Sequence, residues 1–125
     1  MYSICKAYGK KAHIIIDYDS LEEKTGVIAR SLRDDERYRG VFITPARINE
    51  FNHSKTLLVN VDNHKPSLAI DANALDIIKN KVVIDHHRRG EEFIELPLLT
   101  YLEPAASSTV ELIVELFDYQ KEMFV

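Results

Sequence analysis

Lys81-Val82-Val83-Ile84-Asp85-His86-His87-Arg88-Arg89 is the stretch of this chain that decides its fold. A short apolar run stops abruptly at Asp85, and two histidines and two arginines follow it. Such a run is typical of a buried strand in a parallel sheet, and these strands deliver polar side chains into the crevice beyond their carboxyl ends. Carboxylates and imidazoles are metal ligands, and guanidinium groups donate hydrogen bonds to phosphate. We therefore expect a strand end that offers both kinds of group.

A second stretch, residues 56–64, repeats this design. Its apolar strand ends at Asp62, and His64 follows two residues later. Asp62 precedes Asp85 by 23 positions, a gap that fits one crossover of a βαβ unit. Asp71 is expected to cap a short helix over residues 72–80 within this crossover. Because the two strands would then be parallel, both polar clusters should open on the same edge of the sheet.

Strands and helices alternate along the rest of the chain. Further strands are expected over residues 13–17, 41–44 and 98–102. Helices are expected over residues 1–9, from a capping box at Ser20 to about Leu32, from Pro45 to about Phe51, and from Ser108 onward. The sequence therefore predicts an α/β fold with a parallel sheet and flanking helices.

The last helix carries both a start signal and a pattern of apolar residues. Residues 108–111, Ser-Thr-Val-Glu, form a capping box. The residues that recur at the spacing of one helix face, and that we expect to face the core, are Val110, Ile113, Val114 and Phe117.

The composition of the 125 residues is that of an ordinary globular chain, one domain or part of one. Apolar residues make up 46% and charged residues 29%. The formal net charge of −4 argues against a groove for long nucleic acid, because such grooves carry a basic excess. No stretch approaches the roughly 18 apolar residues of a membrane span, and no secretory leader is apparent. The single cysteine, Cys5, is expected to be buried, in a protein of the reducing cytosol.

Asp62 is the best candidate for a metal ligand. Its two oxygens can bridge two cations, an arrangement that clamps the attacking and leaving oxygens of phosphoryl displacement. The alternative is a turn-forming aspartate after a strand, and the matching edge at Asp85 favours the ligand. His86 and His87 are adjacent, so we expect them to point in different directions, one to the metal and the other to a phosphate oxygen or a supporting carboxylate.

Two further groups are candidates for phosphate binding. Ser107, Ser108 and Thr109 occupy a helix N-terminus, which favours an anion, although N-capping accounts for Ser108 without a ligand. Arg88 and Arg89 are candidates because they stand beside the histidines.

Three motifs, in this order, make the chain resemble the DHH phosphoesterase superfamily. They are residues 61–67, Val-Asp-Asn-His-Lys-Pro-Ser, residues 84–89, Ile-Asp-His-His-Arg-Arg, and residues 103–112, Glu-Pro-Ala-Ala-Ser-Ser-Thr-Val-Glu-Leu. Within it, the chain is most similar to the cyclic-di-AMP phosphodiesterases of the GdpP (YybT) type, over essentially its whole length. The resemblance implies a Rossmann-like DHH-domain core that hydrolyses cyclic-di-AMP to the linear dinucleotide pApA with two manganese ions.

The resemblance also implies roles for individual residues. Asp62 would bridge both metals, and His86 would bind one of them. Asp85 and His87 would orient that ligand and meet the substrate phosphate. His64 would be a supporting group or lie on the phosphate side.

Parts of the family pattern are not found in this sequence. They are an upstream His-x-x-x-Asp-x-Asp motif, a later metal-binding aspartate and a substrate-binding DHHA1 domain. Asp17-Tyr18-Asp19 aligns with the family's second strand and is interpreted as a turn, not as a substitute for the missing motif. We therefore expect residues 1–125 to be the central part of a DHH domain, nearly inactive alone, with an exposed sheet edge that favours self-association such as a homodimer. The family often adds membrane helices upstream, so a membrane-associated parent that faces the cytoplasm is expected.

Two alternatives stay open. One is another DHH enzyme, such as an oligoribonuclease acting on short oligonucleotides, a pyrophosphatase or a RecJ-like exonuclease. The His-Lys-Pro-Ser and Asp-His-His-Arg-Arg details favour the cyclic dinucleotide. The other is a non-catalytic α/β module that binds a nucleotide or a partner protein, and such a module would not need Asp62 or His86.

Overall fold

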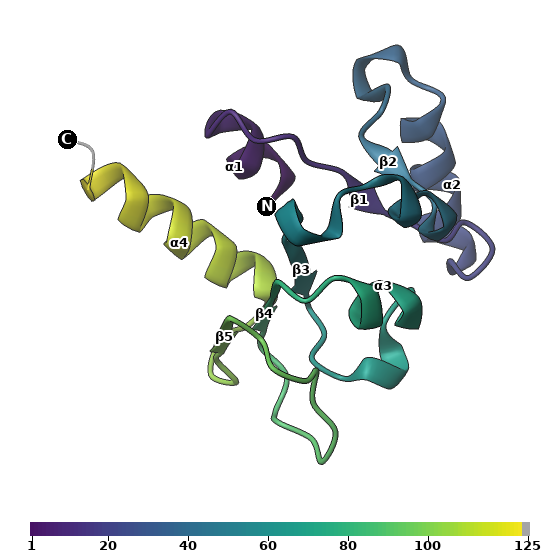
Figure 1. The fold of residues 1–125 in the computed structure, drawn as a ribbon. Coiled ribbons are helices and arrows are strands. Elements are labelled where there is room, and N and C mark those ends of the chain that lie inside the picture. Colours follow the sequence, from purple (N-terminus) through teal and green to yellow (C-terminus); the bar gives the residue numbers. More distant parts are fainter. Residues whose placement is uncertain (124–125) are drawn as a thin grey trace. The chain divides into compact units, whose positions relative to one another are not determined.

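The computed structural model of this chain describes residues 1–123, which form two compact units (Figure 1). One unit ends at Phe51 and the other begins at Asn52. Neighbouring strands are parallel in both units, and an α-helix lies between the strands of one neighbouring pair in each unit, so the predicted parallel α/β fold is confirmed. The strands form two sheets, one in each unit, where the sequence predicted a single sheet.

The first unit holds a two-stranded sheet and two α-helices. These elements are α1 (Tyr2–Ala7), β1 (Ile14–Ile15), α2 (Glu23–Arg33) and β2 (Phe42–Ile43), with 3-10 turns at Glu36–Tyr38 and Pro45–Glu50. The first helix was expected over residues 1–9 and ends at Ala7, and Gly9 follows it with a φ of +69°, which glycine adopts without strain. The predicted capping box before α2 is wrong, because Glu22 is the N-cap and Ser20 donates to the carbonyl of Asp17. Cys5 is partly exposed, where burial was expected.

The second unit contains the residues of the predicted site. Its elements are β3 (Leu58–Val61), α3 (Ala72–Ile77), β4 (Lys81–Asp85), β5 (Leu99–Leu102) and α4 (Thr109–Met123), with 3-10 turns at His53–Lys55 and Pro66–Leu68. The strand order is β3-β4-β5, and α3 lies in the predicted crossover from β3 to β4. Asp71 is the N-cap of α3 as predicted, although its side chain makes no capping bond and the helix ends at Ile77, short of Asn80.

The register of this sheet brings the two polar clusters to one edge. Val61 lies opposite Ile84, and the N–H of Asp62 donates to the carbonyl of Ile84 at 2.9 Å. On the other side, the N–H of Glu103 donates to the carbonyl of Asp85 at 3.0 Å. Asp62 and Asp85 therefore meet at the carboxyl ends of neighbouring parallel strands, as the sequence predicted.

The central strand β4 also forms the core. Val83 is fully buried and packs with Leu75 of α3 and with Ile94, and Ile84 is 2% exposed. Burial of an apolar side chain of this size stabilises the fold by roughly 1.5–3 kcal/mol. Because both faces of β4 are covered, the strand is apolar without alternation.

The helix α4 buries a face different from the predicted one. Val110 and Val114 are 69% and 52% exposed, whereas Thr109 and Leu112 are buried. The buried residues keep the spacing of one helix face, but this face begins one residue earlier than the predicted one. The helix is rotated so that Thr109 faces Asp62. The prediction of a buried Val110 and Val114 is therefore wrong.

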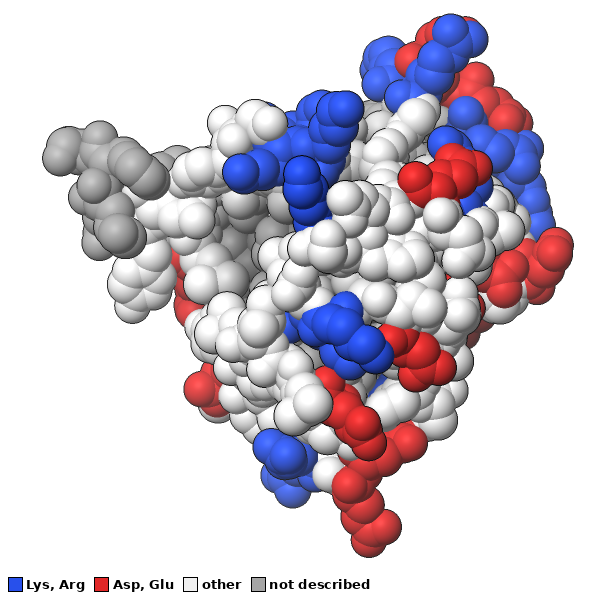
Figure 2. Space-filling view, viewed as in Figure 1, with Lys and Arg blue, Asp and Glu red and all other residues white. Residues whose placement is uncertain are grey.

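Charges of both signs are interspersed in each unit. Figure 2 shows basic side chains next to acidic ones. Arginines of the first unit pair with carboxylates close in sequence at 2.6–3.1 Å: Arg33, Arg37, Arg39 and Arg47. Exposed pairs of this kind add little stability, but they break up the basic surface, in keeping with the negative net charge. No helix within residues 1–123 has the length and apolar character needed to cross a bilayer.

The strand β5 lies at an edge of the second unit's sheet. Leu96, Leu98 and Leu99, on or beside this strand, are 88%, 67% and 56% exposed. This edge therefore carries exposed apolar side chains, whereas the edge expected from the missing upstream strand, and self-association through it, stay predictions.

Candidate metal centre

Asp62 stands in an unusual backbone conformation directly after β3. Its φ is +63°, in the left-handed region that non-glycine residues enter at a cost of order 1–3 kcal/mol. Aspartate and asparagine tolerate this region better than other residues. The side chain is 62% exposed, and its Oδ1 accepts a hydrogen bond from the hydroxyl of Thr109 at 2.9 Å. The chain thus turns sharply at this point and presents the carboxylate at the sheet edge.

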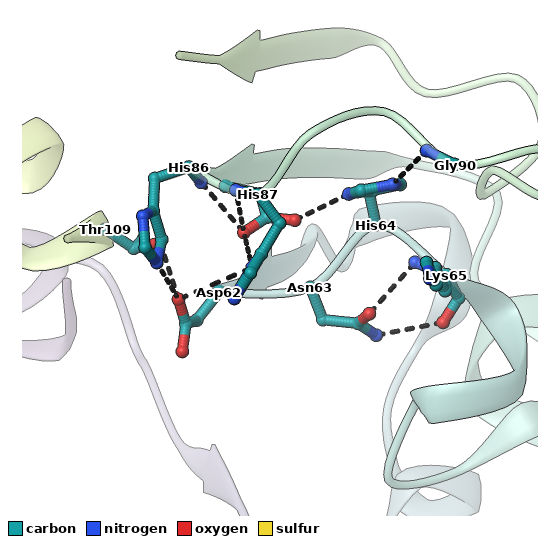
Figure 3. Close-up of polar contacts among 9 residues, drawn as sticks. Asp62, Asn63, His64, Lys65, His86, His87, Gly90 and Thr109 are labelled. Atoms are coloured by element: carbon teal, nitrogen blue, oxygen red, sulfur yellow. Dashed lines mark hydrogen bonds and ion pairs between the residues drawn. The ribbon is translucent and has the colours of Figure 1, made fainter. Parts of the chain in front are cut away.

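Two histidines gather around this carboxylate (Figure 3). His86 Nε2 lies 3.4 Å and His87 Nδ1 4.0 Å from Asp62 Oδ1. One ligand atom from each of the three residues can be chosen so that all lie within 4.8 Å of one another. The two rings are 4.4 Å apart and tilted by 45°. The expectation that adjacent histidines point in different directions is therefore wrong, because the chain turns after β4 and both rings fall on the same side.

Asp85 lies next to this cluster and is fully buried. Its Oδ1 accepts hydrogen bonds from the backbone N–H groups of His86 and His87 at 2.8 and 3.2 Å and lies 2.7 Å from Nδ1 of His87. Its Oδ2 lies 2.6 Å from Nδ1 of His64. Asp85 therefore holds the two histidines through internal hydrogen bonds, and its contact with a substrate phosphate stays a prediction.

The pKa of Asp85 reflects these partners. Burial raises this pKa, but the hydrogen bonds from His64, from the His87 ring and from the N–H groups of residues 87 and 86 outweigh burial, so the pKa of Asp85 lies below its ordinary value. The carboxylate is therefore ionised in the folded chain at neutral pH, which is the state that holds both histidine rings.

An acid-sensitive contribution to stability follows from this lowered pKa. Because the folded-state pKa lies below the unfolded one, the ionised carboxylate stabilises the fold at neutral pH, and this contribution is lost progressively below about pH 5. In metal-free buffer, we expect the difference in unfolding free energy between wild type and Asp85→Asn to be largest near neutral pH and to shrink as the pH falls. Urea denaturation of both chains between pH 3 and pH 7 measures this difference in unfolding free energy. A difference that does not vary with pH would contradict the lowered pKa of Asp85.

His64 lies beneath the site with 1% of its surface exposed. The N–H of Gly90 donates to Nε2 at 3.1 Å, which assigns the proton to Nδ1, so the neutral ring donates to Asp85. Phe93 stacks on the ring at a centroid distance of 5.0 Å. Both ring nitrogens are thus used inside the chain. Of the two predicted roles of His64, these contacts fit the supporting group, and the phosphate-side role stays untested.

The turn that separates Asp62 from His64 is built by Asn63. Its Oδ1 accepts from the N–H of Lys65 at 2.9 Å, and its Nδ2 donates to the Lys65 carbonyl at 3.0 Å. The N–H of Ile94 donates to the carbonyl of His64 at 2.9 Å. These bonds pair the polar groups of the turn backbone. The Asp62 side chain then faces outward at the sheet edge, and the His64 side chain faces inward to the core.

The remaining residues predicted to bind phosphate are Arg88, Arg89, Ser107 and Ser108. Arg88 and Arg89 are both exposed, and the Arg89 guanidinium lies 4.4 Å from the centre of the Phe93 ring. Ser107 donates through its N–H and hydroxyl to Glu111, and the Ser108 hydroxyl accepts from the Glu111 N–H at 3.2 Å. The predicted N-cap bond of Ser108 is therefore confirmed, but the Glu111 carboxylate accepts from Ser107 in place of the Ser108 N–H of a capping box, so both serines are already engaged.

Thr109 contacts Asp62, a role that the sequence did not predict for it. The sequence placed it at the helix N-terminus beside Ser107 and Ser108, but only its hydroxyl reaches Asp62. No local pattern signals a bond between residues 47 positions apart.

In the first unit, Asp17 accepts from the N–H of Asp19 at 3.2 Å, so the predicted turn at these aspartates is confirmed.

The donor set of the cluster fits a divalent cation. Asp62 offers carboxylate oxygens, and His86 and His87 offer ring nitrogens. Because Asp85 engages Nδ1 of His87, the Nε2 of that ring keeps its lone pair for a ligand bond, and a histidine backed by a carboxylate is the usual arrangement at metal sites. Mixed carboxylate and imidazole ligands suit Mn²⁺ and its neighbours in the first transition series.

Comparison with known proteins gives matches over nearly the whole chain. Residues 1–124 match the N-terminal domain of the DHH family. The chain is 44% identical over 117 residues to the cyclic-di-AMP phosphodiesterase GdpP of Bacillus subtilis (strain 168), a match that covers 94% of this chain and 18% of that protein. It is 41% identical over 123 residues to the cyclic-di-AMP phosphodiesterase PdeA of Listeria monocytogenes serotype 1/2a (strain 10403S), with 96% and 18% covered. A membrane protein–large ribosomal subunit bL9 fusion protein of Onion yellows phytoplasma (strain OY-M) is 30% identical over 115 residues, with 90% and 13% covered.

The chain thus spans about a fifth of the length of the first two of these curated relatives, 18% in each case. Within that span, the family match runs from residue 1 to residue 124 and includes the strand edge with Asp62, His86 and His87. The chain belongs to the DHH family.

Proposed function

We propose that this chain carries the metal-binding strand edge of a phosphodiesterase that hydrolyses cyclic-di-AMP to the linear dinucleotide pApA. The observation that carries the proposal is the cluster of Asp62, His86 and His87 at the carboxyl ends of two parallel strands. Two relatives at 44% and 41% identity are named as cyclic-di-AMP phosphodiesterases, which supports this substrate.

In the proposed site, Asp62, His86 and His87 hold manganese, with two ions in a complete site. Bound cations offset the negative charge that develops on the phosphoryl oxygens during displacement. Asp85 holds the His87 ring and the backbone of both histidines in the geometry that ligation needs. Arg88, exposed beside the histidines, is the side chain proposed to bind a substrate phosphate.

We further propose that the 125 residues need other segments for full turnover. The described residues bring together three candidate ligands, which is few for two hard cations that prefer six-fold coordination. The proposed compartment is the cytoplasm, and the free thiol of Cys5, which has no disulfide partner, supports a reducing environment.

The proposal is tested by assaying hydrolysis of cyclic-di-AMP with added Mn²⁺. The assay compares this chain with an extended chain, which is lengthened at both ends to the length of the relatives. The extended chain should convert cyclic-di-AMP to pApA and lose activity in EDTA. The 125 residues alone should be at least about 100-fold less active, since loss of supporting groups alone costs metal sites 10- to 100-fold.

Parallel assays separate the competing enzymes. pApA, short oligoribonucleotides and pyrophosphate are offered to the same extended chain. Faster turnover of any of these than of cyclic-di-AMP would reassign the substrate within the family. Binding of cyclic-di-AMP without hydrolysis of any substrate would contradict the proposed enzyme and favour a nucleotide-binding module.

A further inference from the structure

We propose that Thr109 is a positioning residue of the metal centre, whose hydroxyl holds the Asp62 carboxylate in the orientation that binds the cation. The proposal rests on the metal-binding part of the proposed function. It extends the site from the two strand ends to the first residue of α4. Figure 3 shows Thr109 beside Asp62 and His86.

The first observation is the bond itself. Thr109 is 5% exposed, and its Oγ1 donates to Asp62 Oδ1 at 2.9 Å. This oxygen is the one that lies 3.4 Å from His86 Nε2 and 4.0 Å from His87 Nδ1. Thr109 therefore holds the carboxylate atom around which the cluster is arranged.

The second observation is that the helix does not need this hydroxyl. Ser108 Oγ accepts the N–H of Glu111, and Ser107 donates to the Glu111 carboxylate through its N–H and its hydroxyl. These contacts cap the start of α4 without the Thr109 hydroxyl. Thr109 is the first residue of α4, so no preceding turn of this helix offers a carbonyl to its hydroxyl. The Thr109 hydroxyl instead bonds a residue 47 positions away, so its bond serves the site and not the helix.

The third observation is the need for such a support. Asp62 extends from a left-handed turn with its side chain 62% exposed, so packing alone does not fix its carboxylate. The β-branched Thr109 is stiff about its first side-chain torsion, and its burial leaves the hydroxyl little freedom. One hydrogen bond uses one lone pair of Oδ1 and leaves the remaining lone pairs of the carboxylate for metal.

Substitutions at Thr109 separate the hydroxyl from the rest of the side chain. Thr109→Val keeps the shape and removes the hydroxyl, whereas Thr109→Ser keeps the hydroxyl and removes the methyl group. Loss of a partner that orients a ligand typically weakens metal binding 10- to 100-fold. We expect Thr109→Val to weaken Mn²⁺ binding by about 10-fold or more and Thr109→Ser to stay within about 3-fold of wild type.

The measurement is Mn²⁺ affinity by electron paramagnetic resonance, on the purified extended chain without substrate. Thr56→Val is the matched control, because it removes a threonine hydroxyl that bonds only the carbonyl of Asn52, at 2.8 Å, and should leave the affinity unchanged. If Thr109→Val does not fold, as judged by circular dichroism, Thr109→Ala and Thr109→Ser form a second pair that differs by one hydroxyl.

The outcomes are distinct. Weaker Mn²⁺ binding in the variants without a hydroxyl, with retention in serine, supports the proposal. Equal affinity in both kinds of variant overturns it, and so does an equal loss in the Thr56→Val control. Absence of Mn²⁺ binding by the wild type overturns the metal site and this proposal together. If the hydroxyl contrast is seen but cyclic-di-AMP is not hydrolysed, only the proposed reaction fails.

Discussion

Replacing Asp62 with asparagine is expected to lower Mn²⁺-dependent hydrolysis of cyclic-di-AMP by the extended chain by about 10³-fold or more. The substitution removes the negative charge and one of the ligand oxygens while keeping the shape of the side chain. Charge stabilisation by a bound cation supplies several kcal/mol of a phosphoryl-transfer barrier, and about 4 kcal/mol corresponds to 10³-fold in rate. Steady-state rates of pApA formation at saturating Mn²⁺ measure the effect.

Asparagine is the suitable replacement because of the backbone at this position. It tolerates the φ of +63° as aspartate does, and its Oδ1 can still accept the Thr109 hydroxyl. We therefore expect the unfolding free energy of the metal-free chain to change little. Asp62→Gly provides a second check, since glycine adopts this φ without strain and should keep or raise stability while activity is lost. An Asp62→Asn chain that folds and keeps most of its activity would contradict the assignment of Asp62 as a ligand.

Replacing His64 with leucine is expected to destabilise the metal-free chain by about 3 kcal/mol at neutral pH. Leucine fills much of the space of the ring but removes the donor to Asp85, which then keeps a buried charge with one oxygen unpaired. A hydrogen bond to a charged group contributes about 1.5–3 kcal/mol, and the upper end applies because the Asp85 carboxylate is fully buried. Urea denaturation at pH 7 measures the loss.

Two conservative variants separate the contribution of the His64 Nδ1 hydrogen bond to stability from that of the Nε2 hydrogen bond. In His64→Asn the side-chain amide stands near the place of Nδ1 and can still donate to Asp85. In His64→Gln the longer side chain reaches the place of Nε2 and can still accept from the Gly90 N–H. Because a bond to an ionised group is stronger than a neutral one, we expect His64→Asn to be more stable than His64→Gln. The reverse order would show that anchoring of Gly90, and not support of Asp85, is the main contribution of His64.

The parts of the fold that could be read from the sequence are those specified by local chemistry. Residues 81–85 form a strand because an apolar run that is buried on both faces has few other stable conformations, and the gap to Asp62 has the length of one crossover. The N-cap bond of Ser108 likewise depends on residues a few positions apart. The capping box expected at Ser20 shows the limit of such signals, because Ser20 has an equally good local partner in the carbonyl of Asp17.

The rotation of α4 could not be read in the same way. Its apolar residues allow two neighbouring faces, and the sequence favoured the one with Val110 and Val114. The bond from Thr109 to Asp62 and the burial of Leu112 select the other. The energies that decide between such faces come from contacts with distant residues, which periodicity does not report.

The sequence by itself determined the ligand chemistry and the sheet edge where it gathers, because residue type sets the donor atoms and parallel strands share their carboxyl ends. Only the tertiary structure decided which side chains face outward and which lie beneath. His64 and Asp62 are separated by one residue, yet one is buried at 1% exposure and the other stands in a left-handed turn at the surface. That difference depends on Asp85, Gly90 and Thr109, which are brought near only when the strands and α4 pack together, so no local pattern could encode it.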